Sequence, residues 1–486
     1  MAVKKTRRNT RMSDGIAEAM KEAASKDQDS LAAHSDAAVF RKSIFSTGLF
    51  EIDVNLRPVF GSRIQLLGEA HKGKSLLSYQ MMGAAQNTCR QCLTPIIDFV
   101  HDWTGEIVTT CMCGANEKMR VLLVDSENSF DPAWANRWGM DIDPTFQDQA
   151  DNQIEENVYR SEEDGFFVIK AANAEQTNVI TTHLIRKGYV DMVTVDSIAN
   201  LIPSSRREGK QMIGDHAKAV TQFVTSVVAA QGEAANMDGI APTLLMINQY
   251  RTKIGGFSPT GNPVMAAGGK ALEYNNSITW HLNTKYEYDK INNKMLYGDC
   301  SLRAKKDKES GATHSLAQYR VYVNPVSKSG IDYEPGDTDE GAKILGFLKE
   351  LGSLDSRWFE KKGAKYVIFG REFANLGDIK NFLSRRDVGH MLRFPIYAQM
   401  FPPTLRMHLG HERYDYTPFK DDPILEMYEE AKKQVGVNVR PRKRVPQPVM
   451  LTAKTKRKVR SKSEPDKDSE ELFGDKPTEQ EAGGES

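Results

Sequence analysis

The sequence predicts an α/β protein built on a mostly parallel sheet with helices on both faces. Between residues 41 and 325, short apolar runs alternate with helical patterns, and such runs are typical of strands buried on both faces. A glycine-rich stretch, GEAHKGKS, follows one apolar run and precedes a helical pattern, which gives the order strand, loop, helix. The six predicted strands are 62–67, 120–125, 165–170, 191–196, 243–248 and 277–282.

The length of 486 residues allows two or three domains with a sizeable core. We expect four segments: a basic, partly helical N-terminal segment that serves in polymerisation or as a linker, a large α/β core, a smaller α+β domain and a disordered tail. Their predicted ranges are 1–40, 41–335 (with an insert at 88–116), 336–436 and 437–486.

Formal net charge is zero, but the charges are unevenly distributed. The first twelve residues carry five Lys or Arg, and residues 440–462 carry ten, without an acid in either stretch. Residues 464–486 hold nine acids against two lysines. Such blocks are usually solvated and disordered, although a basic block can hold nucleic acid without reading its sequence.

Localisation signals are weak in this chain. No stretch approaches eighteen apolar residues, so we expect no transmembrane helix. The basic N-terminus is not followed by an apolar h-region, and five cysteines do not make a secreted disulfide framework. We therefore expect a soluble protein inside the cell.

The glycine-rich stretch matches the pattern G-x-x-x-x-G-K-[ST], a phosphate loop. Its backbone N–H groups and the dipole of the following helix would face phosphate oxygens. Lys74 would reach the β- and γ-phosphates of ATP, and the Ser75 hydroxyl would bind Mg²⁺. The alternative is a surface turn with a chance match, but the strand before it and the helix after it argue against that. The loop residues are Gly68, Glu69, Ala70, His71, Lys72, Gly73, Lys74 and Ser75.

An acid near the end of the strand at 120–125 is the candidate catalytic base. Glu127 follows that strand, where a carboxylate beside a phosphate loop can orient and deprotonate a water. The alternative is a helix-capping role, because Asp125, Ser126 and Asn128 are all good capping residues.

Two further strand ends carry polar side chains. Asp196 ends the strand at 191–196 and is predicted as the second Mg²⁺ element. Gln249 follows the strand at 243–248 and can sense the γ-phosphate. A long glycine-rich loop follows it. Asp131 and Trp134 are candidates to contact a purine, one by hydrogen bonding and one by stacking.

Several long motifs together carry a family resemblance. The phosphate loop, VDSENSFDPAWA, VTVDSIANLIP, INQYRTKIG and GGKALEYNNS resemble, in order and spacing, the RecA-type recombinases, including phage UvsX-like members. STGLFEIDVNL resembles the segment before their phosphate loop, and residues 351–383 resemble their small C-terminal domain. The resemblance covers about 41–380.

This resemblance implies a RecA-like P-loop ATPase that forms a helical filament on single-stranded DNA and pairs it with a homologous duplex. It implies self-association, single-strand-binding and mediator proteins as partners, no membrane, and a DNA-associated place in the cytoplasm of a bacterium or phage-infected bacterium. Glu127 matches the family's catalytic glutamate and Gln249 its γ-phosphate sensor. Asp131 and Trp134 match adenine contacts, although the family often has Tyr at the position of Trp134.

The resemblance also implies DNA-binding loops. Residues 202–215 match the first and 250–269 the second. Charged loop residues are usually only solvated surface, which is the alternative. Lys306 and Lys308 match lysines that reach a neighbouring subunit's ATP. The implied contacts to the DNA backbone are Arg206, Arg207, Lys210, Arg251 and Lys253.

The insert at 88–116 departs from the family, which usually has a short loop there. It holds a C-x-x-C pair and a C-x-C pair, with eighteen residues between them, around a predicted hairpin at 98–110. Four thiolates suit tetrahedral Zn²⁺ and a zinc ribbon. The alternative is unrelated buried or redox cysteines. His101 is a weak substitute ligand, and Cys300 is expected to be an ordinary buried thiol. The four predicted ligands are Cys89, Cys92, Cys111 and Cys113.

Two other functions compete with strand exchange. One is a helicase or branch-migration ATPase, since zinc-bearing relatives of RecA act there, although their zinc module precedes the core. The other is a non-hydrolysing DNA-binding filament scaffold. The presence of Glu127, Asp196 and Gln249 together argues against a scaffold.

Overall fold

The computed structural model describes residues 46–385 with gaps, together with Val388, Leu392 and Ile396. The chain divides into two compact units, Met1–Lys443 and Arg444–Ser486, and the second unit lies wholly outside the described residues. The predicted N-terminal segment (1–40) and tail (437–486) lie outside them too. The gaps are 92, 94–95, 101–106, 112–114, 144, 147–152, 156–157, 162–164, 172, 208–213, 239–240, 253–263, 267–269, 386–387, 389–391 and 393–395.

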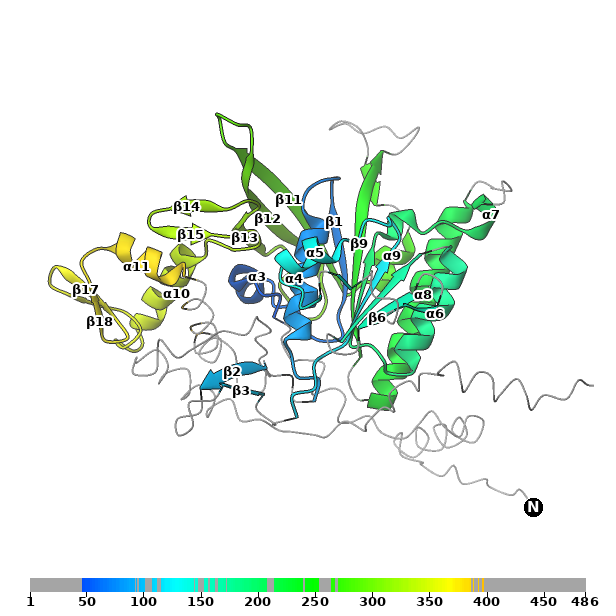
Figure 1. Ribbon diagram of the computed structural model, residues 1–486, viewed down its shortest axis with the longest axis horizontal. Helices are drawn as coiled ribbons and strands as arrows, with labels where there is room; N and C mark the ends of the chain where they lie inside the picture. Colours follow the sequence, from blue (N-terminus) through cyan, green and yellow to red (C-terminus); the bar gives the residue numbers. More distant parts are fainter. Residues whose placement is uncertain are drawn as a thin grey trace, which may run out of the picture. The chain divides into compact units, whose positions relative to one another are not determined.

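The first unit is organised around one large sheet, in the order β13-β12-β11-β1-β9-β8-β4-β7-β6-β5, with β10 paired to β9 (Figure 1). The six central strands from β11 to β7 run parallel to one another. They are the six predicted strands, so the predicted α/β class is confirmed. Their bounds are β1 Arg63–Gly68, β4 Val121–Asp125, β7 Phe166–Lys170, β8 Met192–Asp196, β9 Thr243–Thr252 and β11 Ile278–Tyr288.

The strands β4, β7 and β8 in the middle of the sheet are largely apolar and buried, because both of their faces are covered. In β4, Val121 and Leu123 pack into one apolar cluster, whereas Leu122 and Val124 pack into another. The first cluster includes residues of α4 and α5, and the second includes residues of α6, α8 and α9. Helices therefore cover both faces of the sheet, as Figure 1 shows.

The helices alternate with the strands along the chain. None of the described helices is long and apolar enough to cross a membrane. Their bounds are α3 Phe50–Asn55, α4 Lys74–Gln86, α5 Pro132–Arg137, α6 Ala174–Arg186, η2 Ile198–Asn200, α7 Ser204–Arg207, α8 Asp215–Asp238, α9 Lys270–Asn275, α10 Gly341–Gly352 and α11 Leu376–Leu383.

Antiparallel strands that the sequence analysis did not predict extend the sheet at both edges. On one side, β12 (Met295–Asp307) and β13 (Leu316–Tyr322) follow β11. On the other side, β6 (Val158–Ser161) and β5 (Gln153–Glu155) follow β7, and β10 (Val264–Ala266) pairs with β9. Polar and apolar residues alternate in β12, which is the pattern of a strand with one covered face.

The predicted hairpin of the insert is present as β2 (Ile97–Val100) paired with β3 (Ile107–Thr110). The chain leaves the core and returns to it side by side, because Cys89 forms an antiparallel bridge with Lys118. The Arg90 N–H donates to Glu117 O at 2.8 Å, and the Met119 N–H donates to Thr88 O at 2.8 Å. The insert is therefore closed at its base.

A buried ion pair ties the base of the insert to the sheet. The Arg90 guanidinium contacts both carboxylate oxygens of Asp191, at 3.2 and 3.3 Å. The two residues are 7% and 8% exposed, and Asp191 directly precedes β8. The Arg120 N–H also donates to Asp191 at 3.0 Å. Removing one partner of a buried pair leaves a charge without compensation, so these contacts hold the insert against the core.

A separate apolar cluster lies in the C-terminal part of the described residues. It combines α10 and α11 with a three-stranded sheet, β16 (Glu360–Lys362), β17 (Lys365–Ile368) and β18 (Arg371–Phe373). A short hairpin, β14 (Val326–Lys328) and β15 (Ile331–Tyr333), precedes it. Phe50 and Val54 of α3 belong to this cluster, whereas Leu49 and Ile52 belong to the core cluster around β1. The predicted limits of the small domain, 336 and 436, stay predictions.

One close approach positions the phosphate-loop helix. In α4, a Cβ added at Gly83 would lie 1.9 Å from Gly139 O, whereas one added at Gly232 in α8 would have nothing within 4 Å. We expect Gly83→Ala to lower the melting temperature, because the backbone must move, at a cost of about 1–3 kcal/mol.

The matched control, Gly232→Ala, should keep or raise the melting temperature, since alanine favours a helix interior by roughly 0.5–1 kcal/mol. Thermal unfolding of both variants beside the parent checks this. Equal melting temperatures for the two variants would contradict the close contact.

Candidate nucleotide site

The register of the parallel strands brings the predicted site residues to one edge of the sheet. Gly68, where β1 enters the phosphate loop, lies opposite Gln249 of β9. Asp125 of β4 lies opposite Asp196 of β8. Because β1, β9, β8 and β4 are consecutive in the sheet, the phosphate loop, Gln249, Asp196 and the segment that carries Glu127 are neighbours in space.

The phosphate loop turns directly into α4. Gly73 is the residue before this helix and has φ 80°, a left-handed conformation that glycine adopts without strain. Lys74 is 6% exposed, and its ammonium donates to Glu69 O at 2.6 Å. Burial lowers the pKa of Lys74, and the nearby Asp196 and Glu127 carboxylates oppose this. The loop is also fastened to β11, since the Lys72 ammonium donates to Thr284 O at 3.1 Å.

Asp196 and Ser75 form the part of the site that is suited to a cation. Asp196 is 5% exposed, and burial raises its pKa to about 6, although a hydrogen bond from the Ser75 side chain opposes the shift. The carboxylates of Glu127 and Asp125 add to the increase. A buried carboxylate beside a hydroxyl is a hard oxygen donor set, which suits Mg²⁺. These two residues therefore fit the predicted Mg²⁺ role.

Glu127 is held by hydrogen bonds from three side chains, all of which donate to the same oxygen. Its Oε1 accepts from the Ser197 hydroxyl at 2.9 Å, the Asn200 amide at 2.8 Å and the Gln249 amide at 3.2 Å. Among the described residues no hydrogen bond to Oε2 is present. The carboxylate is thus oriented through one oxygen, and the other remains available to a water molecule.

A pair of serines joins the segments after β4 and β8. The Ser126 hydroxyl donates to Ser197 O at 2.7 Å and accepts from the Ser197 N–H at 2.8 Å. The Ser126 N–H donates to Asp196 O at 2.9 Å. These bonds fix Glu127, the next residue after Ser126, relative to the end of β8.

The predicted purine contacts lie at the start of α5. Asp131 caps this helix, because its Oδ1 accepts from the Trp134 N–H at 3.1 Å. The Trp134 ring packs at 5.8 Å from the ring of Trp138. The acid that closes the preceding turn is Asp125, which accepts from the N–H groups of Ser129 and Phe130 at 3.2 and 3.0 Å. Asp131 thus caps α5 and Asp125 closes the turn before it, whereas Glu127 does neither.

The predicted DNA-binding residues are placed only in part. Arg206 and Arg207 lie in α7 and Arg251 lies in β9, but their side chains are outside the described part of the molecule. Lys210 and Lys253 lie outside the described residues altogether.

Lys306 lies near the end of β12, and Lys308 directly follows this strand. The Lys306 ammonium donates to Glu273 O of α9, and burial lowers its pKa. Lys308 is exposed.

Of the four predicted zinc ligands, Cys89 and Cys111 are described and buried, and Cys92 and Cys113 are outside the described residues, as is His101. Neither Cys89 nor Cys111 forms a disulfide with another residue that the structure describes. Within the described part of the chain, no group of three or more His, Cys, Asp or Glu side chains is arranged to hold a metal. Cys300 is buried and free of a disulfide, as expected, and burial raises its pKa to about 11.

The sequence analysis missed three residues of the site. Ser197 and Asn200 lie inside the motif VTVDSIANLIP, and their contact with Glu127 joins residues about seventy positions apart. Tyr79 of α4 is buried, and burial together with Asp196, Asp125, Asp131 and Glu127 raises its pKa. The position of Tyr79, one turn beyond the phosphate loop, can be read from the sequence. The four carboxylates that raise its pKa come together only in the folded chain.

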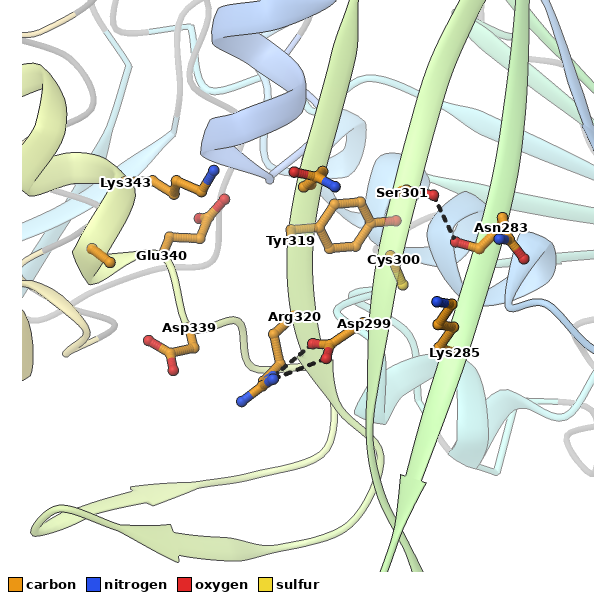
Figure 2. Close-up of a pocket in the computed structure, with 12 residues that line it drawn as sticks. Asn283, Lys285, Asp299, Cys300, Ser301, Tyr319, Arg320, Asp339, Glu340 and Lys343 are labelled. Atoms are coloured by element: carbon orange, nitrogen blue, oxygen red, sulfur yellow. Dashed lines mark hydrogen bonds and ion pairs between the residues drawn. The ribbon is translucent and has the colours of Figure 1, made fainter.

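A pocket of about 580 Å³ lies where β11, β12 and β13 meet the start of α10 (Figure 2). Several of its charged side chains are bound to other groups. Arg320 binds Asp299 through two hydrogen bonds, at 2.7 and 2.9 Å, and Glu340 accepts from the Glu51 N–H at 3.1 Å. None of the predicted nucleotide or DNA residues lines this pocket.

The raised pKa of Asp196 makes stability depend on pH. The carboxyl binds its proton more tightly in the folded protein than at its ordinary pKa of 3.8, so its favourable contribution is complete below pH 4 and is lost as the pH rises through 6. Above pH 6, the ionised form costs on the order of 2–3 kcal/mol. In EDTA at pH 7.5, Asp196→Asn should therefore raise the melting temperature, and the gain should shrink as the pH falls toward 4.

The same variant should bind ATP more weakly when Mg²⁺ is present, because a carboxylate is replaced by a neutral amide. Thermal scans across pH and titrations with nucleotide measure the two effects. A lower melting temperature for the variant than for the parent in EDTA at pH 7.5 would contradict the burial argument.

Comparison with known proteins agrees with this arrangement. A family model for the RecA N-terminal domain matches residues 104–327, a range that begins after the phosphate loop. Protein RecA of Bifidobacterium longum (strain NCC 2705) is 27% identical over 287 residues, which is 52% of this chain and 63% of that protein. Protein RecA of Bifidobacterium breve is 27% identical over 243 residues, 49% of this chain and 52% of that protein. The chain thus spans less than two thirds of the length of these curated relatives. These matches show that about half of the chain is similar to RecA proteins, and they agree with the fold and the strand-end site.

Proposed function

We propose that this chain is a DNA-dependent ATPase that forms a filament on single-stranded DNA and catalyses homologous pairing and strand exchange. The observation that carries the proposal is the placement of Glu127. It lies beside the phosphate loop and Asp196, and its carboxylate is oriented by side chains from the segment after β8 and from β9. A scaffold that only binds ATP has no need for an oriented carboxylate.

The roles in hydrolysis follow from this geometry. The N–H groups of the phosphate loop and Lys74 bind the phosphates, and Ser75 and Asp196 hold Mg²⁺. Bound Mg²⁺ supplies charge neutralisation on the phosphate oxygens. Glu127 orients the attacking water and accepts its proton, while Gln249 senses the γ-phosphate. Asp131 and Trp134 bind the purine from the start of α5.

The DNA-binding part of the proposal rests on the family resemblance and on where the loops begin. Residues 202–215 follow the segment after β8, and residues 250–269 begin within β9, directly after Gln249. Both DNA loops therefore start beside the nucleotide site. Arg206, Arg207, Lys210, Arg251 and Lys253 contact the DNA backbone in this proposal.

Filament formation places Lys306 and Lys308 against the ATP of a neighbouring subunit. Single-strand-binding and mediator proteins, a DNA-associated cytoplasmic location, and a phage-type origin complete the proposal. These last points rest on the sequence resemblance alone.

The proposed chemistry predicts a variant that binds but does not turn over. Glu127→Gln should lower the ATP hydrolysis rate with single-stranded DNA by at least about 10²-fold, the scale of losing a general base. Its affinities for ATP and DNA should match the parent, since the phosphate loop and Asp196 are unchanged. Phosphate release, nucleotide binding and joint-molecule formation with a homologous duplex are the measurements.

Two controls make this test specific. Glu360→Gln, in β16 and far from the site, should hydrolyse ATP like the parent, and Lys74→Ala should lose ATP binding itself. DNA-stimulated hydrolysis without joint molecules would instead indicate a branch-migration enzyme. Absence of hydrolysis in the parent would refute the ATPase assignment.

We also propose that the insert binds one Zn²⁺ through Cys89, Cys92, Cys111 and Cys113. In support, the paired strands β2 and β3 follow a ribbon plan, and Cys89 and Cys111 are 0% and 5% exposed. The Asn116 N–H donates to Cys111 Sγ at 3.4 Å, a contact that favours a thiolate. Thiolates are the preferred donors of structural Zn²⁺.

Metal content tests this assignment. Protein purified without chelator should carry about one Zn²⁺ per chain, because one tetrahedral site takes four thiolates. Cys111→Ser should release the metal and make residues 88–116 sensitive to protease, whereas Cys300→Ser, outside the insert, should retain it. Parent protein that contains no zinc under these conditions would exclude the ribbon.

A further inference from the structure

We propose that Asn200 is a positioning residue for Glu127 and that it connects this carboxylate to the first predicted DNA loop. The proposal rests on the proposed function, because it assigns a role in the same hydrolysis. Gln249 already has such a role at the start of the second loop. Asn200 is a second amide on the same carboxylate oxygen, delivered from a different strand end.

The Asn200 contact is the shortest of the three hydrogen bonds to Glu127. Its amide lies 2.8 Å from Oε1, compared with 3.2 Å for the amide of Gln249. Asn200 is the last residue of η2, a single turn that follows β8, and its own N–H donates to Ser197 O at 3.0 Å. The same Ser197 O accepts from the Ser126 hydroxyl. The amide is thus fixed by the backbone that also fixes Glu127.

The two ends of the first predicted DNA loop meet at this turn. The ring of His216, in the first turn of α8, is hydrogen-bonded to Ala199 O at 2.9 Å. The Ser205 hydroxyl donates to Asp215 at 3.1 Å. The segment 202–215 is therefore closed at its base directly beside Asn200, and a displacement of this segment acts on η2 through the Ala199 contact.

A second anchor limits where such a displacement can go. The Ser204 N–H donates to Glu175 of α6 at 3.0 Å, and the Ala174 N–H donates to Ile202 O at 2.9 Å. The start of the loop is thus held on α6, and η2 lies between this fixed point and β8. Movement transmitted by His216 therefore changes the position of the Asn200 amide, and with it the direction of Oε2.

A purely structural role for Asn200 makes a different prediction from a positioning role. A structural amide would stabilise η2 whatever residue stands at position 127. A positioning amide matters for the rate only while residue 127 is a carboxylate that needs orientation. A double-mutant cycle separates the two roles, because the effects of coupled residues are not additive.

The experiment measures ATP hydrolysis with and without single-stranded DNA in the parent, Asn200→Ala, Asn200→Asp, Glu127→Gln and the double variant Asn200→Ala with Glu127→Gln. Asn381→Ala, in α11, is the control and should equal the parent. Nucleotide affinity, DNA affinity with a non-hydrolysable ATP analogue, and melting temperature are measured for each.

Asn200→Ala should lower kcat about tenfold, the scale of a hydrogen bond to a charged group, with KM and both affinities near parental values. Stimulation of kcat by DNA should shrink as well. Asn200→Asp has the same shape but places a second carboxylate against Glu127, so its kcat should fall further. In the Glu127→Gln background, Asn200→Ala should cause no additional loss.

An unchanged kcat in Asn200→Ala, or an equal loss in both backgrounds, overturns the positioning role. Full DNA stimulation of Asn200→Ala overturns the connection to the first loop. If Asn200→Ala melts much lower than the parent, the rates are compared below the melting temperature of every variant, and the loss in the Glu127 background against that in the Glu127→Gln background decides between the roles. Absence of hydrolysis in the parent would refute the proposed function instead, and the two failures are thereby distinguished.

Discussion

The candidate site depends on the parallel register of four neighbouring strands. With β1, β9, β8 and β4 in this order, the carboxyl ends of all four strands meet at one edge of the sheet. Gly68, Asp196 and Asp125 are the last residues of β1, β8 and β4. Gln249 of β9 lies opposite Gly68, although β9 itself continues to Thr252. Both faces of the strands are covered by helices, so the backbone at this edge has little freedom. A shift of one residue in any strand would remove its functional side chain from the edge.

This edge concentrates negative charge, which the fold tolerates at a cost. Asp125 and Asp196 are both almost fully buried, and Glu127 is exposed beside them. The cost is reduced by local hydrogen bonds, namely two backbone N–H groups on Asp125 and three side chains on Glu127. Lys74 supplies a buried positive charge close by. A cluster of this kind is expected where a folded protein gives up stability for the binding of charged ligands.

The features that depend on residues close together in the sequence could be predicted from the sequence alone. The six central strands, the phosphate loop and the insert hairpin were all predicted, because each has a local pattern of apolar or glycine residues. The antiparallel strands β12 and β13 were missed, since their pairing depends on a sheet already formed by β11. The contact between Asn200 and Glu127 was missed for the same reason: it joins two strands that pair only in the folded chain. Asp131 was predicted to contact a purine, which stays a prediction, and its role as the cap of α5 was not foreseen.

The division of α3 between two apolar clusters constrains how this chain can be shortened. Phe50 and Val54 contact the C-terminal cluster, with Phe50 at 5.2 Å from the ring of Phe347, while Ile52 packs into the core. A truncation placed after residue 335, the limit suggested by sequence, would expose both side chains to solvent. Such a fragment would expose apolar surface that favours aggregation, and it is a poor choice for expression or crystallisation. In the same way, a homologue could lose its C-terminal part during evolution only if residues 50 and 54 became polar as well.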